Sequence, residues 1–109
     1  MKPAPDKNNK PTNILTPDIV REILIEAGWR ETTHNPNKMY HFEKKGENGL
    51  TANGYVYNYP EDRNGDGKAY IGVRKGQEPI ECFDFAYGRN NIEDVKTVLE
   101  SKIKRHLGI

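Results

Sequence analysis

Two segments with helical periodicity enclose a series of alternating segments, and few folds accommodate this order. The first helix is predicted over residues 17–27, because apolar residues recur there at helical spacing. Thr16 is a suitable N-cap, and Gly28 is a suitable left-handed stop. The last helix is predicted over residues 92–107, with an apolar stripe along one side and acidic residues in its first turn.

Four strands are predicted between these helices, because apolar and polar residues alternate between turns rich in Gly, Asn and Pro. They cover residues 39–44, 54–59, 68–74 and 80–87. The stretch KGENGLTANG, residues 45–54, is expected to be a long turn. Since the connections are short, consecutive strands should pair antiparallel as a meander.

The predicted fold class is therefore α+β, a two-layer sandwich. A helix, a four-stranded antiparallel meander and a second helix follow in order, with both helices on one sheet face. The other face would meet water or a partner. The expected core residues of the sheet are Phe42, Ile71, Val73, Phe83 and Phe85. Residues 14–109 are expected to form a single domain, and residues 1–13 a flexible tail rich in Pro, Lys and Asn.

The composition argues against several classes of protein. Lys and Arg total 17 and Asp and Glu total 16, so the net charge of +1 gives no overall attraction to nucleic acid or anionic membranes. With one cysteine, the chain has no internal disulfide framework. No apolar stretch is long enough to span a bilayer, and the first residues lack the apolar segment of a signal peptide. We expect a soluble, cytoplasmic protein.

No group of residues follows a known catalytic pattern. The one serine, Ser101, lies in the predicted last helix without a glycine elbow. His34, His41 and His106 are not at metal-ligand spacing. Cys82 lies in the middle of a predicted strand, where a lone cysteine is typically a small core residue. We therefore expect a protein that is not an enzyme and needs no cofactor.

The stretch DRNGDGK, residues 62–68, resembles the first half of the EF-hand calcium loop. Asp62, Asn64 and Asp66 fall at the first, third and fifth ligand positions of that loop. The twelfth position is Val73 instead of the usual Glu, and a strand rather than a helix precedes the stretch. Asn-Gly and Asp-Gly are also preferred in hairpin turns. A calcium site and an ordinary hairpin turn remain two alternatives.

Tyrosines are the most distinctive surface candidates. Tyr55, Tyr57 and Tyr59 share one face of the second predicted strand, and Tyr70 lies in the third. These rings belong either to the rim of the core, with only the hydroxyls in water, or to an exposed platform. Exposed aromatic side chains would anchor a protein partner or stack on nucleic-acid bases.

The sequence thus favours a small, non-enzymatic binding module that engages a protein through the open sheet face and adjoining turns. The predicted contact residues are Tyr55, Tyr57, Tyr59, Tyr70, Arg74 and Lys75. The alternative is nucleic-acid binding, with phosphate contacts from Lys44, Lys45, Arg74 and Lys75. The near-neutral net charge places this alternative second.

Overall fold

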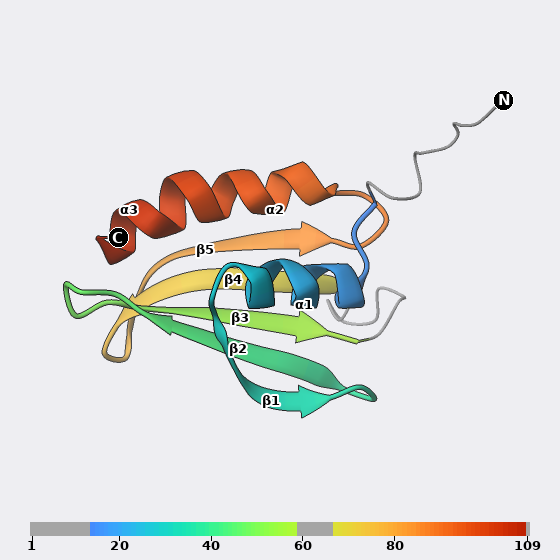
Figure 1. The fold of residues 1–109 in the computed structure, drawn as a ribbon, viewed down its shortest axis with the longest axis horizontal. Helices are drawn as coiled ribbons and strands as arrows, with labels where there is room; N and C mark the ends of the chain where they lie inside the picture. Colours follow the sequence, from blue (N-terminus) through green and yellow to red (C-terminus); the bar gives the residue numbers. More distant parts are fainter. Residues whose placement is uncertain (1–13, 59–66, 109) are drawn as a thin grey trace, which may run out of the picture.

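The chain is an α+β domain built on one antiparallel sheet (Figure 1). The computed structural model describes residues 14–58 and 67–108. Three helical stretches are named α1, α2 and α3, and a π-helical turn named η2 joins the last two. The elements are α1 (Pro17–Glu26), β1 (Arg30–Asn35), β2 (Met39–Lys45), β3 (Thr51–Tyr57), β4 (Lys68–Lys75), β5 (Glu78–Ala86), α2 (Ile92–Val98), η2 (Leu99–Ile103) and α3 (Lys104–Leu107). The strand order in the sheet is β1-β2-β3-β4-β5, so each strand pairs with its neighbour in the chain.

The prediction of four strands was wrong, because the sheet has a fifth strand, β1, at its edge. The sequence of β1, RETTHN, has no apolar alternation, and five of its six residues are exposed. It pairs antiparallel with β2 and carries a bulge between Glu31 and Thr33. A solvent-facing edge strand buries little surface, so the alternation that reveals a half-buried strand is missing here.

The second predicted strand also begins earlier than expected. β3 starts at Thr51, so the last four residues of the predicted turn, 51–54, are strand and include the buried Ala52 and Asn53. The turn itself is closed by a hydrogen bond from the Gly46 N–H to the Leu50 carbonyl at 2.8 Å. Glycine and asparagine suggested a turn here, but pairing with both β2 and β4 keeps the segment extended.

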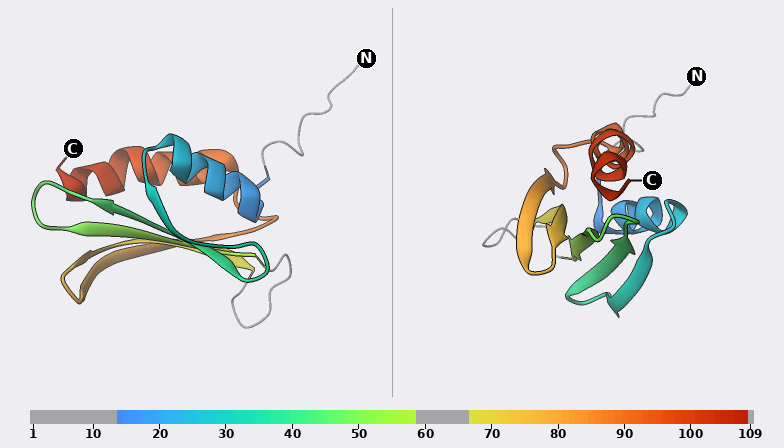
Figure 2. Two further views of the ribbon diagram at one scale, coloured as in Figure 1. Left: turned by 60° about the horizontal axis from the view of Figure 1, so that its bottom comes forward. Right: turned by 90° about the vertical axis from the view of Figure 1, so that its left-hand side faces the viewer.

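Helix α1 and the continuous stretch from α2 to α3 lie on the same side of the twisted sheet, as the end-on view in Figure 2 shows. The first helix is capped by Thr16, whose hydroxyl oxygen accepts a hydrogen bond from the Ile19 N–H. The helix approaches β3 closely at Gly54, where a Cβ would lie 2.9 Å from Leu24 Cδ1. A side chain at this position would therefore push the helix away from the sheet.

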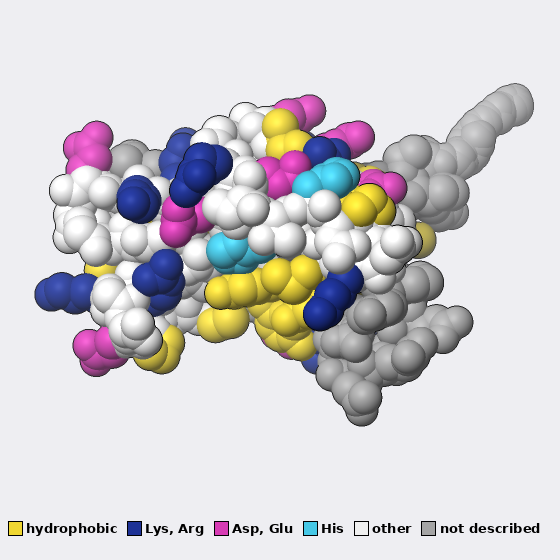
Figure 3. All heavy atoms as spheres, turned by 90° about the horizontal axis from the view of Figure 1, so that it is seen from below, with side chains coloured by type: hydrophobic (Ala, Val, Ile, Leu, Met, Phe, Trp, Pro, Cys, Tyr) yellow, Lys and Arg dark blue, Asp and Glu magenta, His cyan; other side chains and the backbone are white. Residues whose placement is uncertain are grey.

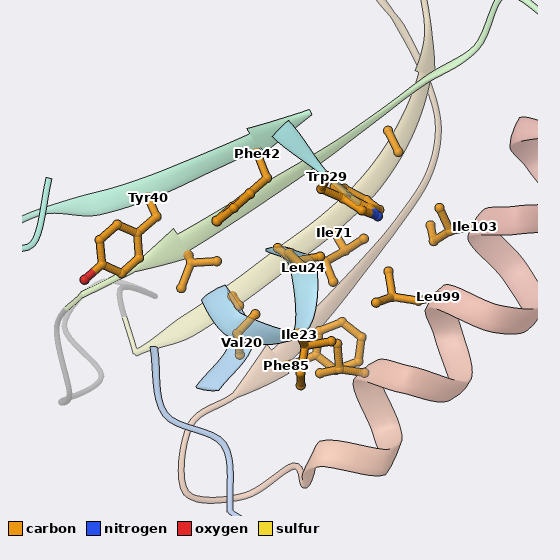
Figure 4. Close-up of a cluster of buried hydrophobic side chains, with 14 of the residues drawn as sticks. Val20, Ile23, Leu24, Trp29, Tyr40, Phe42, Ile71, Phe85, Leu99 and Ile103 are labelled. Atoms are coloured by element: carbon orange, nitrogen blue, oxygen red, sulfur yellow. The ribbon is translucent and has the colours of Figure 1, made fainter. Parts of the chain in front are cut away.

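The core lies between the helices and the sheet (Figure 4). Four of the five predicted sheet residues, Phe42, Ile71, Val73 and Phe85, are buried, and Phe83 is partly buried. From the helices, the buried residues include Val20, Leu24, Val95, Leu99, Ile103 and Leu107. The predicted alternation and helical stripe therefore identified part of the core, and the buried strand residues Tyr40, Ala52, Val56 and Ala69 were not in the predicted set.

The end of α3 is capped by the turn between β2 and β3. The Glu47 N–H donates to the Leu107 carbonyl at 3.1 Å, and the Asn48 amide donates to the His106 carbonyl at 2.5 Å. At Gly46 a Cβ would lie 2.6 Å from the Leu107 carbonyl oxygen. The turn thus satisfies carbonyls that a helix end leaves without intrahelical partners.

Candidate functional site

Three of the predicted tyrosines lie on the sheet face opposite the helices. Tyr55 and Tyr57 flank Val56, which is buried beneath the helices, and Tyr70 lies between two other buried positions of β4. Tyr55 is 37% exposed, and Tyr57 and Tyr70 are half-buried. They therefore lie outside the core that fills the space between the helices and the sheet. Tyr59 lies outside the described residues.

The rings form a continuous band across three strands, and we call it the aromatic band (His41, Tyr55, Tyr57 and Tyr70). His41 pairs with Tyr55 across β2 and β3, and Tyr55 pairs with Tyr70 across β3 and β4. The ring centroids of His41 and Tyr55 are 4.7 Å apart, and Tyr57 and Tyr70 make an edge-to-face contact at 5.9 Å. In Figure 3, seen from the side of β1 and β2, hydrophobic side chains form a patch beside a histidine.

A hollow of about 170 Å³ adjoins the aromatic band. Gly72 lies between Asn53 and Cys82 in the sheet register and has no side chain to fill the space. The lining residues are Asn53, Tyr55, Gly72, Val73, Arg74, Pro79, Glu81 and Cys82. The open face therefore combines raised rings with a depression next to them.

A network of polar side chains lies beside the aromatic band on the same sheet face. Asn53, only 5% exposed, accepts a hydrogen bond from Arg74 Nε on its side-chain oxygen at 2.7 Å. Its amide nitrogen lies 3.2 Å from His41 Nε2 and can only donate, so His41 Nε2 accepts. The other ring nitrogen, Nδ1, faces the Thr32 hydroxyl. Burial lowers the pKa of His41, so the ring is held neutral.

Glu43 links the charged side chains of this face. Its carboxylate lies 3.0 Å from Arg30 Nη2 and 3.8 Å from Arg74 Nη2. Arg74 also donates through Nη1 to the Gly76 carbonyl at 2.7 Å. The guanidinium at the side of the hollow is thus fixed and largely compensated.

Sequence reasoning missed Glu43 and Asn53 as residues of this face. The sequence predicts a turn at Asn53, whereas the structure places this residue in β3. One signal was available: Thr51, Asn53, Tyr55 and Tyr57 recur at every second position, which extends the strand backwards from Tyr55.

The predicted basic residues do not share one surface. Lys45 and Arg74 belong to the open face, since they alternate with residues that point toward the helices. Lys44 lies on the helix side, where its Nζ is 3.4 Å from the Ala27 carbonyl. Lys75 follows Arg74 and is exposed where β4 ends. The four residues proposed for nucleic-acid contacts are therefore divided between the two sides of the sheet.

A second hollow, of about 390 Å³, lies where β1 meets β2. Its lining residues are Gly28, Arg30, Glu43, Lys44 and Lys45. Three of these side chains are cationic and one is acidic. This hollow is distinct from the aromatic band. Its lining is more basic than that of the hollow beside Gly72.

Cys82 is exposed on the open face, contrary to the expectation of a core residue. Partial burial and the nearby Asp84 raise the pKa of its thiol, which lowers the thiolate fraction at neutral pH. Within residues 14–58 and 67–108, no group of three His, Cys, Asp or Glu side chains could hold a metal ion. Asp62, Asn64 and Asp66 lie outside these ranges, so the calcium alternative stays a prediction.

Comparison of the chain with protein families, with curated proteins and with solved structures gave no match. Among the described residues, no helix has both the length and the apolar character needed to cross a bilayer.

Proposed function

We propose that this chain is a small interaction module that binds a protein partner through the open face of its sheet. The observation that carries the proposal is the aromatic band, with Tyr55 exposed, beside the Gly72 hollow on the sheet face opposite the helices. The contact residues of the proposal are Tyr55, Tyr57, Tyr70 and Arg74, with Lys75 at the margin and Tyr59 kept from the sequence.

The chemistry of this face favours a protein over a polyanion. Tyrosine provides a large and rather rigid contact area at a low cost in conformational entropy, together with a hydroxyl for hydrogen bonding. Arg74, which lines the hollow beside the band, is already paired with Asn53 and Glu43. A surface with an apolar centre and a compensated charge at its side resembles the centre and rim of a protein interface.

The test is an affinity pull-down from a lysate of the source cell, with the full chain as bait and with and without nuclease. A stoichiometric protein should be retained after nuclease treatment. Tyr55→Ala and Tyr70→Ala should each weaken its binding by about tenfold or more, as expected for central aromatic contacts. The matched control is Ile25→Ala, which removes a 43% exposed side chain from α1 on the opposite side.

If both tyrosine variants bind the retained protein as tightly as the unchanged chain, the open face is not its docking surface. If Ile25→Ala alone weakens binding, the partner docks on the helix side, and the proposal is wrong.

The alternative of nucleic-acid binding keeps Lys44, Lys45, Arg74 and Lys75 as the phosphate contacts. The hollow that Lys44 and Lys45 line together with Arg30 supports it. It predicts that nucleic acid is recovered in the pull-down, that accompanying proteins are lost after nuclease, and that affinity falls steeply with salt. Lys45→Gln would then weaken binding, whereas Tyr55→Ala would leave a phosphate-driven contact at this hollow intact.

A further inference from the structure

The outer edge of β5 ends the sheet, and only part of its backbone is satisfied. β5 pairs with β4 on one side and with no other strand of the described residues on the other. In an antiparallel ladder, the N–H and C=O groups of successive residues point alternately toward one neighbouring strand and the other. The Tyr87 N–H points inward to the Gly67 carbonyl at 3.1 Å. Because of this alternation, the backbone N–H and C=O groups of Ala86, Asp84 and Cys82 point outward, away from β4.

One end of this edge is closed by the chain itself. The Ala86 N–H donates to Asn90 Oδ1 at 2.8 Å, and its carbonyl accepts from the Arg89 and Asn90 N–H groups. At the other end the register shifts, with Val73 opposite Glu81 and Arg74 opposite Pro79. Regular outward groups are thus confined to Cys82 and Asp84.

The opposite edge of the sheet is built differently. β1 is polar, carries the bulge between Glu31 and Thr33, and is short. Bulges, short length and charged side chains are the features by which edge strands avoid pairing with other chains. The Cys82–Asp84 segment of β5 has a regular backbone and no lysine among its side chains.

We propose that β5 pairs antiparallel with β5 of a second copy of this chain, about a two-fold axis at Phe83. This axis sets Cys82 of each copy opposite Asp84 of the other, and Phe83 opposite Phe83. Both residue pairs exchange backbone N–H and C=O groups, so all four free groups of each copy are used. An axis at Cys82 or at Asp84 would leave one of these two residues facing the bulge or the closed end.

The charges fit this register. Asp84 faces the uncharged Cys82 of the second copy, and its own carboxylate lies 3.2 Å from Lys68 Nζ. Glu81 lies opposite Phe85 and is paired with His106 within its own chain, with the carboxylate 2.8 Å from Nε2. No like charges are directly opposite one another across the new strand pair, where they would be destabilising. The contact is short, so a weak, concentration-dependent dimer is expected.

Sedimentation velocity on the full chain, from about 10 µM to about 1 mM, tests the proposal; this range suits interfaces of small area. The sedimentation coefficient should rise from monomer toward dimer with concentration. Asp84→Pro removes an outward N–H that β4 does not use, and should weaken the dimer about tenfold or more. Asp84→Asn is the matched control, because it also removes the charge but keeps the N–H, and it should still dimerise.

A disulfide tests the register. Asp84→Cys places a thiol opposite Cys82 of the second copy in a hydrogen-bonded pair, where Cα atoms are about 5.5 Å apart and a disulfide can form. Mild oxidation should give a covalent dimer. The unchanged chain should not cross-link, because its two Cys82 residues are diagonal neighbours about 7–8 Å apart.

A monomeric sedimentation coefficient over the whole range, or equal association of the Asp84→Pro and Asp84→Asn variants, would overturn the proposal. Ready cross-linking of the unchanged chain would instead indicate an axis at Cys82, and so contradict the register. These measurements need no other protein, so their outcome is separate from that of the pull-down.

Discussion

At the scale of single residues, the open face depends on one buried amide. Asn53 lies between Arg74 and His41 and uses both ends of its side chain, one to accept and one to donate. Since Arg74 cannot accept a hydrogen bond, the Asn53 amide cannot turn round without losing its partner. His41 must then present an unprotonated Nε2. The chemistry of one amide thus fixes the protonation state of a ring in the aromatic band.

This arrangement predicts that the free energy of unfolding decreases as the pH falls, because His41 becomes protonated. Burial lowers the pKa of His41 below its ordinary value of 6.5, so the unfolded chain binds its proton more readily than the folded chain. The contribution is complete above pH 6.5 and declines as the pH falls below that value. The free energy of unfolding should be measured by urea unfolding between about pH 5 and about pH 7.5, a range that includes the ordinary pKa of histidine.

The comparison variant for this prediction is His41→Gln, which keeps a polar side chain but does not titrate. It should reduce the slope of stability against pH. An NMR titration of His41 with its midpoint at or above the ordinary value would contradict the prediction.

At the scale of elements, β1 is held to the rest of the domain by specific side-chain contacts. Arg21 of α1 makes a two-point ion pair with Glu31, with Nε–Oε2 at 2.8 Å and Nη2–Oε1 at 3.1 Å. His34 stacks on Tyr40 with centroids 4.9 Å apart, and the Arg21 guanidinium lies 5.2 Å from the same ring. The hydrogen bonds from Arg21 lower the pKa of Glu31, as expected of a paired carboxylate.

Removing the Glu31 carboxylate should therefore loosen β1 locally. In Glu31→Ala, we expect backbone amides of β1 and the facing part of β2 to exchange with solvent about three- to tenfold faster, because local opening becomes easier. Amides of β4 should be unaffected. The matched control is Thr33→Ala, an exposed change on the same strand. Equal acceleration in both variants would mean that the ion pair does not anchor β1.

At the scale of the whole molecule, the two sides of the sheet have different roles. Phe42 of β2 points to the helix side and is fully buried. Tyr55 of the neighbouring strand β3 points to the open side and is exposed. In the proposed function, stability and binding therefore draw on different residues. This separation should allow side chains of the open face to be altered without unfolding the chain.

Two alanine substitutions test this separation. Phe42→Ala should lower the free energy of unfolding by about 3–5 kcal/mol, because it removes a buried ring and leaves a cavity. Tyr55→Ala should lower it by about 1 kcal/mol or less, which is the range of a cross-strand pair on an exposed face. Urea unfolding at neutral pH gives both values. A loss in Tyr55→Ala as large as that in Phe42→Ala would show that the aromatic band is part of the stabilising core.

The helices and the core could be read from the sequence because their signals are local. Thr16, Gly28 and Asn91 mark helix ends through contacts with residues a few positions away. The apolar alternation of β2 and β4 likewise gives each strand its buried side. These local patterns led to the α+β class, the order of the predicted elements and the helical part of the core, but they left out the buried strand residues Tyr40, Ala52, Val56 and Ala69.

Only the tertiary structure decided three features. These are the fifth strand, the side of the sheet on which the tyrosines lie, and the polar network beside them. β1 is held by Arg21, ten residues before Glu31, and Arg74 meets Asn53 across twenty-one residues. Such contacts depend on which strand lies next to which and on the side that the helices cover. Periodicity shows that a strand has two faces, but only packing decides which of them is covered by helices and which stays open.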